Sequence, residues 1–178
     1  MLWRMLFFCI FVKTNTLPMK RLLLLIALLS PLCLLAEERT IHSPSRTLTL
    51  TVTLDEGVLR YHIEAEGVRL LEPSPVGLRT NHSNFCDSLS LIGWHESHID
   101  THYTMSRTKA AESHYRANVL VAEVANAAGR KIAVEWRVDD RNVAFRYLLP
   151  KDGAEASARI MEERSGFRLP TQTTTFLT

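Results

Sequence analysis

The stretch "TLTLTVTL", residues 47–54, alternates threonine with leucine or valine at every position. In an extended chain this alternation puts the apolar side chains on one face and the threonines on the other. Threonine suits the water-facing side of a sheet, and leucine and valine supply a side that can be buried. Residues 47–54 therefore predict a half-buried β-strand that contributes one face to a hydrophobic core.

The segments that follow continue this pattern and are separated by turn residues. "DEG" at 55–57 predicts a turn, "VLRYHIEAEG" at 58–67 alternates again before Glu-Gly, and "VRLLEPSP" occupies 68–75. Because proline has no backbone N–H, Pro73 and Pro75 predict the end of strand pairing. Three antiparallel strands joined by short turns are expected.

The rest of the chain predicts more strands and no helix. Residues 76–114 are rich in Ser, His and Asn and predict a long loop or a set of short edge strands. Strand signals return at 118–124, 131–138, 143–149 and 156–170. Short strands at regular spacing predict an all-β, antiparallel sandwich. "TQTTTFLT", 171–178, reads as the start of another strand, so the sandwich is expected to be incomplete at its C-terminus.

Composition and charge narrow the class of protein. Of the 178 residues, 46% are hydrophobic and 22% are charged, as in an ordinary globular domain with a core. The formal net charge is +2. Its lysines and arginines are scattered along the chain, which gives no basic footprint, so nucleic acid is not expected as a partner.

Residues 1–36 contain an export signal. "MKRLLLLIALLSPLCLLAEE", 19–38, has a positive start, an apolar run and the small residue Ala36 before two acids. This layout predicts a secretory signal peptide cleaved near Ala36, with Met19 as the true start of translation. One long signal anchor is the alternative, although neither apolar run reaches the roughly 20 residues of a spanning helix.

The cysteines are consistent with this location. Cys9 and Cys33 precede the predicted cleavage point, so Cys86 is the single cysteine of the mature chain. A lone cysteine forms no internal disulfide, and stability must come from packing. Leu32 is not the small residue that a lipoprotein signal needs before its cysteine. A secreted, bacterial periplasmic chain that does not span the membrane after cleavage is expected.

The histidines of "WHESHIDTHY", 94–103, are a candidate metal site. His95, His98 and His102 would converge on zinc if the segment were helical, because residues three and four apart share a helical face. The segment has no helix cap and lies among predicted strands. Solvated loop histidines are therefore the simpler expectation.

The chain shows no catalytic arrangement. Glu162 and Glu163 are adjacent, so in a strand they point to opposite faces and cannot act as a pair. Asp139 and Asp140 fall in a predicted turn, where aspartate hydrogen-bonds the backbone. Cys86 is expected to be buried and inert. The sequence also lacks a G-x-S-x-G elbow and a phosphate-binding glycine loop.

Three stretches share a pattern with one known family. They are "SPSRTLTLTVTLDEGVLRYHIEAEGVRLLEPSPVGLRT" at 43–80, "RKIAVEWRVDDRNVAFRYLLP" at 130–150, and "EERSGFRLP" leading to "TTTFLT" at 162–178. Together they resemble the N-terminal domain of glycoside hydrolase family 97, over roughly residues 38–178. The most specific part is "VAFRY" after an acidic turn. Asn142 stands where the family usually has glycine, a tolerable change because asparagine also accepts positive φ.

The resemblance implies a fold and an activity for a longer parent protein. It implies a galactose-mutarotase-like β-super-sandwich at 37–178, followed in the family by a (β/α)₈ barrel that carries the catalytic carboxylates. The family's enzymes are secreted α-glucosidases and α-galactosidases, so α-linked oligosaccharide and the missing barrel are the implied partners. Nothing in this chain matches the barrel's carboxylates. The chain alone is therefore expected to be catalytically silent.

The resemblance also implies roles for single residues. Glu163 matches the family's "E-x-[ST]-x-F" as "ERSGF", 163–167, which implies a calcium ligand in the full-length enzyme, an ion suited by oxygen donors. Glu162, one residue away, is the alternative match. Arg146, which lies among apolar neighbours in "VAFRY", is expected to form a structural ion pair with an acid such as Glu135 or Glu163.

Two other functions are alternatives to a domain of a glycoside hydrolase. A free-standing periplasmic saccharide-binding module would use aromatic faces for sugar rings, and Trp94 is its binding candidate because it falls in the irregular region. Trp136 alternates with Val134 and Val138 and is expected in the core instead. An envelope interaction or scaffold protein would need only the fold.

Overall fold

The computed structural model describes residues 37–104, 112–151 and 157–174. The chain divides into two units, Met1–Leu35 and Ala36–Thr178, and the described residues all belong to the second. The predicted signal peptide, the start at Met19 and cleavage near Ala36 lie outside the described residues. Within the described ranges, no helix is long and apolar enough to cross a membrane.

The first sheet contains the predicted meander and one further strand. Its antiparallel order is β1 (Glu37–His42), β2 (Leu48–Asp55), β3 (Val58–Ala65) and β4 (Val68–Pro75). β1 was not expected, because Ile41 is its single buried side chain and no apolar alternation marks it. It pairs with β2 over its whole length, from Glu37 opposite Leu54 to His42 opposite Thr49.

The two turns of the meander have left-handed backbones. Glu56 and Gly57 have φ of 49° and 74°, and Glu66 and Gly67 have φ of 49° and 81°. Two successive residues with positive φ form the tight hairpin turn that matches the twist of the flanking strands. The predicted Glu-Gly turns are confirmed.

The second sheet corrects the expected irregular region. Its antiparallel order is β10 (Val143–Leu148), β9 (Lys131–Val138), β8 (Glu112–Ala125) and β7 (Ser90–Thr104). The expectation of a loop or short edge strands over 76–114 is wrong for β7, which is a 15-residue edge strand. β8 also begins earlier than the predicted strand at 118. β9 pairs only with Asn118–Ala125 of β8. Residues 112–117 of β8 therefore pair with residues 99–104 of β7 alone, and these two segments form a two-stranded arm.

A third, small sheet joins segments far apart in the sequence. Its order is β11 (Ile160–Glu163), β5 (Leu78–Thr80) and β6 (Asn84–Phe85). Within 157–170, the described part of the predicted strand, continuous strand pairing covers Ile160–Glu163. Past β11 the chain keeps single bonds to the first sheet, including a bridge between Glu72 and Arg168.

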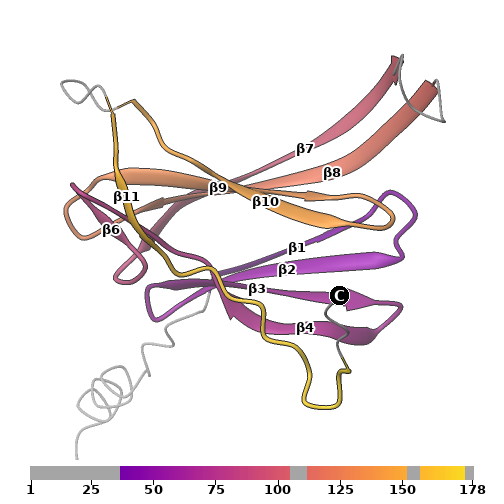
Figure 1. Ribbon diagram of the computed structural model, residues 1–178, viewed down its shortest axis with the longest axis horizontal. Coiled ribbons are helices and arrows are strands. Elements are labelled where there is room, and N and C mark those ends of the chain that lie inside the picture. Colours follow the sequence, from indigo (N-terminus) through magenta and orange to yellow (C-terminus); the bar gives the residue numbers. More distant parts are fainter. Residues whose placement is uncertain (1–36, 105–111, 152–156, 175–178) are drawn as a thin grey trace, which may run out of the picture. The chain divides into compact units, whose positions relative to one another are not determined.

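The core lies between the two four-stranded sheets, which form two layers in Figure 1. Trp136 of β9 is fully buried, as predicted, and its ring centroid lies 6.5 Å from that of Tyr61 on β3. Leu50 and Val52, from the alternating stretch 47–54, are also fully buried. The inward faces of β2, β3, β8 and β9 supply the buried apolar area that drives folding.

The acidic turn between β9 and β10 connects the layers. Asp139 accepts hydrogen bonds from the backbone N–H groups of Arg141 and Asn142, both at 2.7 Å, as predicted for a turn. Asp140 instead accepts from the N–H of Ser45, at 2.7 Å, in the turn between β1 and β2. Asn142 does not have the positive φ expected of it, and its side-chain amide donates to Asp139 at 3.2 Å. This hydrogen bond, not backbone conformation, is what asparagine supplies here.

Arg146 forms the expected ion pair with Glu135. Its guanidinium Nη2 lies 2.8 Å from Oε2 of Glu135, directly opposite on β9, and Arg137 Nε lies 2.7 Å from Oε1. Arg146 is itself 57% exposed, whereas Glu135 is 8% exposed. The buried member of the cluster is therefore the carboxylate, and the two arginines cover it on the face opposite the core.

Replacing Arg146 by leucine is expected to lower the melting temperature by a few degrees at pH 7. Burial alone would raise the pKa of Glu135, but hydrogen bonds from Arg146 and Arg137 lower it below its ordinary value. A lowered folded-state pKa stabilises the fold above the unfolded carboxyl pKa of about 4.3, and that gain is lost as pH falls through the folded value. The difference between wild type and variant should therefore shrink between pH 7 and about pH 3.

Arg60→Leu is the matched control. Arg60 also lies on a strand, but its partner Asp55 is 3.8 Å away and both side chains are exposed. Such a pair contributes little to stability. The melting temperatures are measured by calorimetry. Equal melting temperatures for Arg146→Leu and Arg60→Leu would show that the Arg146–Glu135 pair does not stabilise the fold.

Candidate functional site

Glu163 ends β11, opposite Leu78 of β5, and its side chain is exposed. Its Oε1 accepts a hydrogen bond from the Ser165 hydroxyl at 2.8 Å. Among the described residues, its second carboxylate oxygen has no hydrogen-bond partner. Glu163 therefore presents one fixed oxygen and one free oxygen at the surface of the small sheet.

A chain of hydroxyls connects Glu163 to the backbone of Gly77. The Tyr147 hydroxyl lies 2.7 Å from the Ser165 oxygen, which can accept from it because Ser165 donates to Glu163. The N–H of Gly77 donates to the Tyr147 oxygen at 2.8 Å. Burial, opposed by these hydrogen bonds, raises the pKa of Tyr147, so the phenol stays protonated and able to donate. Tyr147 thus links "VAFRY" to "ERSGF".

The last residue of "ERSGF" anchors the segment on an aromatic cluster. The ring of Phe167 meets Tyr61 edge to face at a centroid distance of 6.5 Å and lies 6.4 Å from Phe145. The intervening Gly166 donates its N–H to the carbonyl of Pro75 at 2.9 Å. A Cβ on Gly166 would lie 3.0 Å from Pro75 Cδ, so a larger residue would disturb this contact.

Glu162 has different surroundings from Glu163. Its carboxylate lies 2.8 Å from Arg79 Nη2 and 2.6 Å from Arg164 Nε. The hydrogen bond from Arg164 is the main cause that lowers the pKa of Glu162. Two arginines already neutralise this acid, whereas Glu163 is held only by a neutral hydroxyl. Of the two possible matches, Glu163 carries the freer carboxylate.

Trp94 lies on β7, opposite Ala122 of β8, and not in a loop. It is partly buried and packs against the core. Tyr103 is 44% exposed and lies an odd number of positions away on the same strand, so the two rings face opposite sides. They do not form one stacking platform, and a sugar-binding role for Trp94 stays a prediction.

Two shallow cavities lie elsewhere on the domain. One of about 490 Å³ is lined by Thr80, Phe85, Lys131 and Pro150 among others, and one of about 430 Å³ lies between β1 and β7. Neither is lined by Trp94 or Glu163. These two cavities therefore give no support to a sugar site at either residue.

The histidines of 94–103 are brought together differently from the helical prediction. Because the segment is a strand, His95 lies on one face and His98 and His102 on the other. His102 instead faces His114 across the hairpin, which sequence reasoning missed because the strand pairing was not known. Cys86 is buried, as expected, and burial raises the pKa of its thiol.

Comparison with known proteins agrees with this arrangement. The family model described as Glycosyl-hydrolase 97 N-terminal matches residues 41–178. A probable retaining alpha-galactosidase from Streptomyces bingchenggensis (strain BCW-1) is 31% identical over 134 residues, which cover 75% of this chain and 20% of that protein. The chain thus spans about a fifth of the length of the curated relative it matches.

Solved structures show the same fold. A β-arabinopyranosidase superposes with a TM-score of 0.75 at 42% identity, covering 78% of this chain and 22% of that one. A glycoside hydrolase family 97 enzyme from Pseudoalteromonas sp. strain K8, in complex with panose, gives a TM-score of 0.69 at 18% identity, covering 75% of this chain and 20% of that one. Because the family model covers 41–178 and the described fold accords with it, the chain belongs to the glycosyl-hydrolase 97 N-terminal family.

Proposed function

We propose that this chain is the sandwich domain of a secreted α-glycoside hydrolase and that Glu163 supplies one ligand to a calcium ion beside the parent's catalytic site. The observation that supports this proposal is the hydrogen-bonded series from Gly77 through Tyr147 and Ser165 to Glu163. It fixes one carboxylate oxygen and leaves the other free. The signal-peptide layout of 19–36 supports secretion.

The donor chemistry of Glu163 fits calcium only as part of a larger ligand set. Calcium takes 6–8 oxygen ligands, and carboxylates are its common donors. A single exposed carboxylate binds a divalent ion weakly, so the remaining ligands must come from outside this domain. The part of this chain is to hold Glu163 at a defined position, because its carboxylate is oriented by Ser165.

The relatives' names support a galactose-configured substrate. One relative is a probable retaining alpha-galactosidase and another is a β-arabinopyranosidase. Arabinopyranosides of the L series have the ring stereochemistry of galactosides without the exocyclic carbon, so one pocket can accept both classes. We therefore propose that the parent enzyme cleaves α-galactosides or the equivalent β-arabinopyranosides, and that α-linked oligosaccharide reaches the active site along a wall formed by this domain.

A chimaeric enzyme tests the proposal. Residues 37–178 replace the corresponding sandwich of the 42% identical β-arabinopyranosidase, and hydrolysis of aryl glycosides is measured against calcium concentration. Glu163→Gln is expected to raise the calcium concentration for half-maximal activity at least about tenfold, because it removes a charged oxygen ligand. Glu162→Gln, the matched control one residue away, should change it less than about twofold.

The outcomes test separately whether Glu163 binds calcium and whether the sandwich supports the catalytic barrel. Equal calcium dependence for Glu163→Gln and Glu162→Gln would show that Glu163 is not a ligand. An inactive chimaera whose sandwich is folded by circular dichroism would count against a family-type interface with the barrel. Hydrolysis by the isolated chain, above the rate of a buffer blank, would overturn the view that catalysis requires the barrel.

A further inference from the structure

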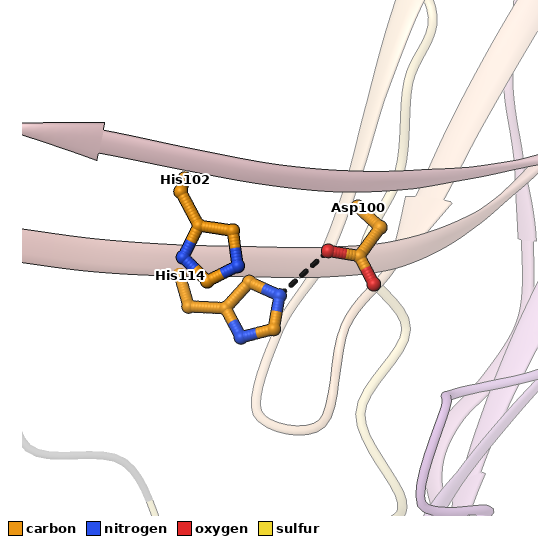
Figure 2. A group of neighbouring side chains, drawn as sticks. All are labelled: Asp100, His102 and His114. Atoms are coloured by element: carbon orange, nitrogen blue, oxygen red, sulfur yellow. Dashed lines mark hydrogen bonds and ion pairs between the residues drawn. The ribbon is translucent and has the colours of Figure 1, made fainter.

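The outer part of the β7–β8 arm carries a cluster of metal-binding side chains separate from Glu163. Asp100 and His102 are two residues apart on β7, and His114 on β8 is paired directly with His102. By strand alternation these three side chains lie on one face of the arm. Figure 2 shows them gathered on that face, with the two imidazoles stacked and the carboxylate beside His114.

The distances are close to those of a metal centre. The donor atoms of the three side chains all lie within 4.8 Å of one another. The ring centroids of His102 and His114 are 3.9 Å apart at an interplanar angle of 13°, and His114 Nε2 lies 2.6 Å from Asp100 Oδ1. Ligand atoms around tetrahedral zinc are about 3.4 Å apart, from bond lengths of about 2.0–2.2 Å. Because all three side chains are exposed, rotations about their own bonds can close this difference.

The backbone holds the ligand positions before any ion arrives. Continuous antiparallel pairing runs from Asp100 opposite Arg116 to Thr104 opposite Glu112, on both sides of the His102–His114 pair. The two imidazoles therefore meet without a folding cost at the moment of binding. In this respect the cluster differs from scattered surface histidines, which would have to be brought together.

We propose that Asp100, His102 and His114 form a binding site for a divalent transition metal, with zinc as the reference ion and a fourth position open to water. Two imidazole nitrogens and one carboxylate oxygen are the donor set of many zinc sites with an open position. Imidazole nitrogen selects zinc, copper and nickel over calcium and magnesium. A bound ion joins β7 to β8 beyond the last residue that β9 supports, and it stiffens the arm.

The surrounding charges allow a cation at neutral pH. The hydrogen bond from His114 is the main cause that lowers the pKa of Asp100, so the carboxylate is ionised. Strand alternation places His98 and Arg116 toward one end of this face and Glu112 toward the other. Arg116 opposes a bound cation, whereas Asp100 and Glu112 favour it.

Titration of the full chain with zinc tests the site. Calorimetry at pH 7.5 should give one saturable equivalent, and the histidine side-chain resonances of His102 and His114 should shift while that of His95 does not. Binding should be lost in His114→Ala and His102→Ala and weakened in Asp100→Asn. Calcium at the same concentration should produce no such shifts.

His95→Ala is the matched control, since His95 is an exposed histidine on the same strand but on the opposite face, 3.5 Å from Glu123. It should bind zinc as the wild type does. Zinc binding that survives both His102→Ala and His114→Ala, or no saturable binding to the wild type, would overturn the proposal. His102→Gln replaces His102→Ala if circular dichroism shows loss of the fold. Because Glu163 takes no part in the cluster, Glu163→Gln should leave zinc binding unchanged whether or not the calcium proposal holds.

Discussion

Replacing Trp136 by alanine should reduce the free energy of unfolding by about 3–5 kcal/mol, the typical loss for a fully buried aromatic side chain. Trp136 has no exposed surface and contacts the Tyr61 ring between the two sheets, so the cavity would lie in the centre of the sandwich. Domains of this size are stable by about 5–15 kcal/mol, and the variant should be at the edge of folding. Urea denaturation followed by circular dichroism measures the shift in midpoint.

Two companion variants separate the volume of Trp136 from its polarity. Among the described residues, the indole Nε1–H of Trp136 has no hydrogen-bond partner. Trp136→Phe removes this unpaired donor while it keeps most of the ring, so its loss should be within about 1–2 kcal/mol. Trp94→Ala, at the partly buried tryptophan of β7, should also cost less than Trp136→Ala. A loss for Trp136→Ala no larger than for Trp94→Ala would contradict the placement of the core.

Gly77→Ala should destabilise the domain although it adds only a single methyl group. A Cβ on Gly77 would lie 2.9 Å from the Cα of Cys86, a distance that no side-chain rotation can relieve. Overpacking of this kind costs about 1–3 kcal/mol. Gly77 also bonds Tyr147 through its N–H, so a backbone shift should disturb the position of Glu163. Thermal melting and the calcium dependence of the chimaera are the two measurements.

Gly93→Ala is the control for this prediction. The nearest atom to a Cβ on Gly93 is 4.0 Å away, and its φ is not positive. It should therefore melt within a degree or two of the wild type. Adding Cys86→Ala to Gly77→Ala should recover only part of the loss, because the contact with the Cys86 Cα remains. Full recovery would show that the thiol, and not the backbone, limits the space at Gly77.

Most of the sandwich could be predicted from the sequence where one strand face is buried. Residues 47–54 repeat an apolar residue at every second position, and β2 buries Leu50, Val52 and Leu54 as this pattern predicts. Thr51, on the face that was expected to meet water, is buried as well. The two Glu-Gly turns are marked in the sequence by their glycines, because Gly57 and Gly67 have positive φ, which glycine adopts without steric cost. In these segments the residues that favour a strand or a turn locally are also the residues that the packed sandwich needs.

β7 could not be predicted in this way. Its outer half is paired with β8 alone, and both of its faces are exposed, so no apolar alternation marks residues 96–104 as a strand. β7 forms a strand because it pairs with β8. Residues 118–125 of β8 do show the alternation of buried and exposed side chains that β7 lacks. His102 lies opposite His114 because of the register in which β7 pairs with β8. The periodicity of a single sequence does not predict that register.

The surroundings of Glu163 were predictable only in part. The resemblance singled out Glu163 with Glu162 as the alternative match, and alternation predicted only that the two point to opposite faces. The hydroxyls of Ser165 and Tyr147 were not expected to orient it, because their contact joins the segment after β11 to β10, far apart in the sequence. The sequence predicts an ion pair of Arg146 with an acid such as Glu135 or Glu163, and the structure selects Glu135, which is the buried member of the pair. Strand alternation identifies which residues share a face, and it does not give how deeply each is covered.

The small sheet has a consequence for the order in which the protein folds. The meander β2–β3–β4 closes through tight turns, and such local pairings form early because little chain entropy is lost. β11 must instead find β5 across the intervening strands β6 to β10, since Ile160 pairs with Thr80. Glu163 therefore reaches its final position late in folding. Under the calcium proposal, a molecule in which β11 has not paired with β5 would hold Glu163 out of place, so calcium-dependent activity of the parent enzyme would report that β11 has docked.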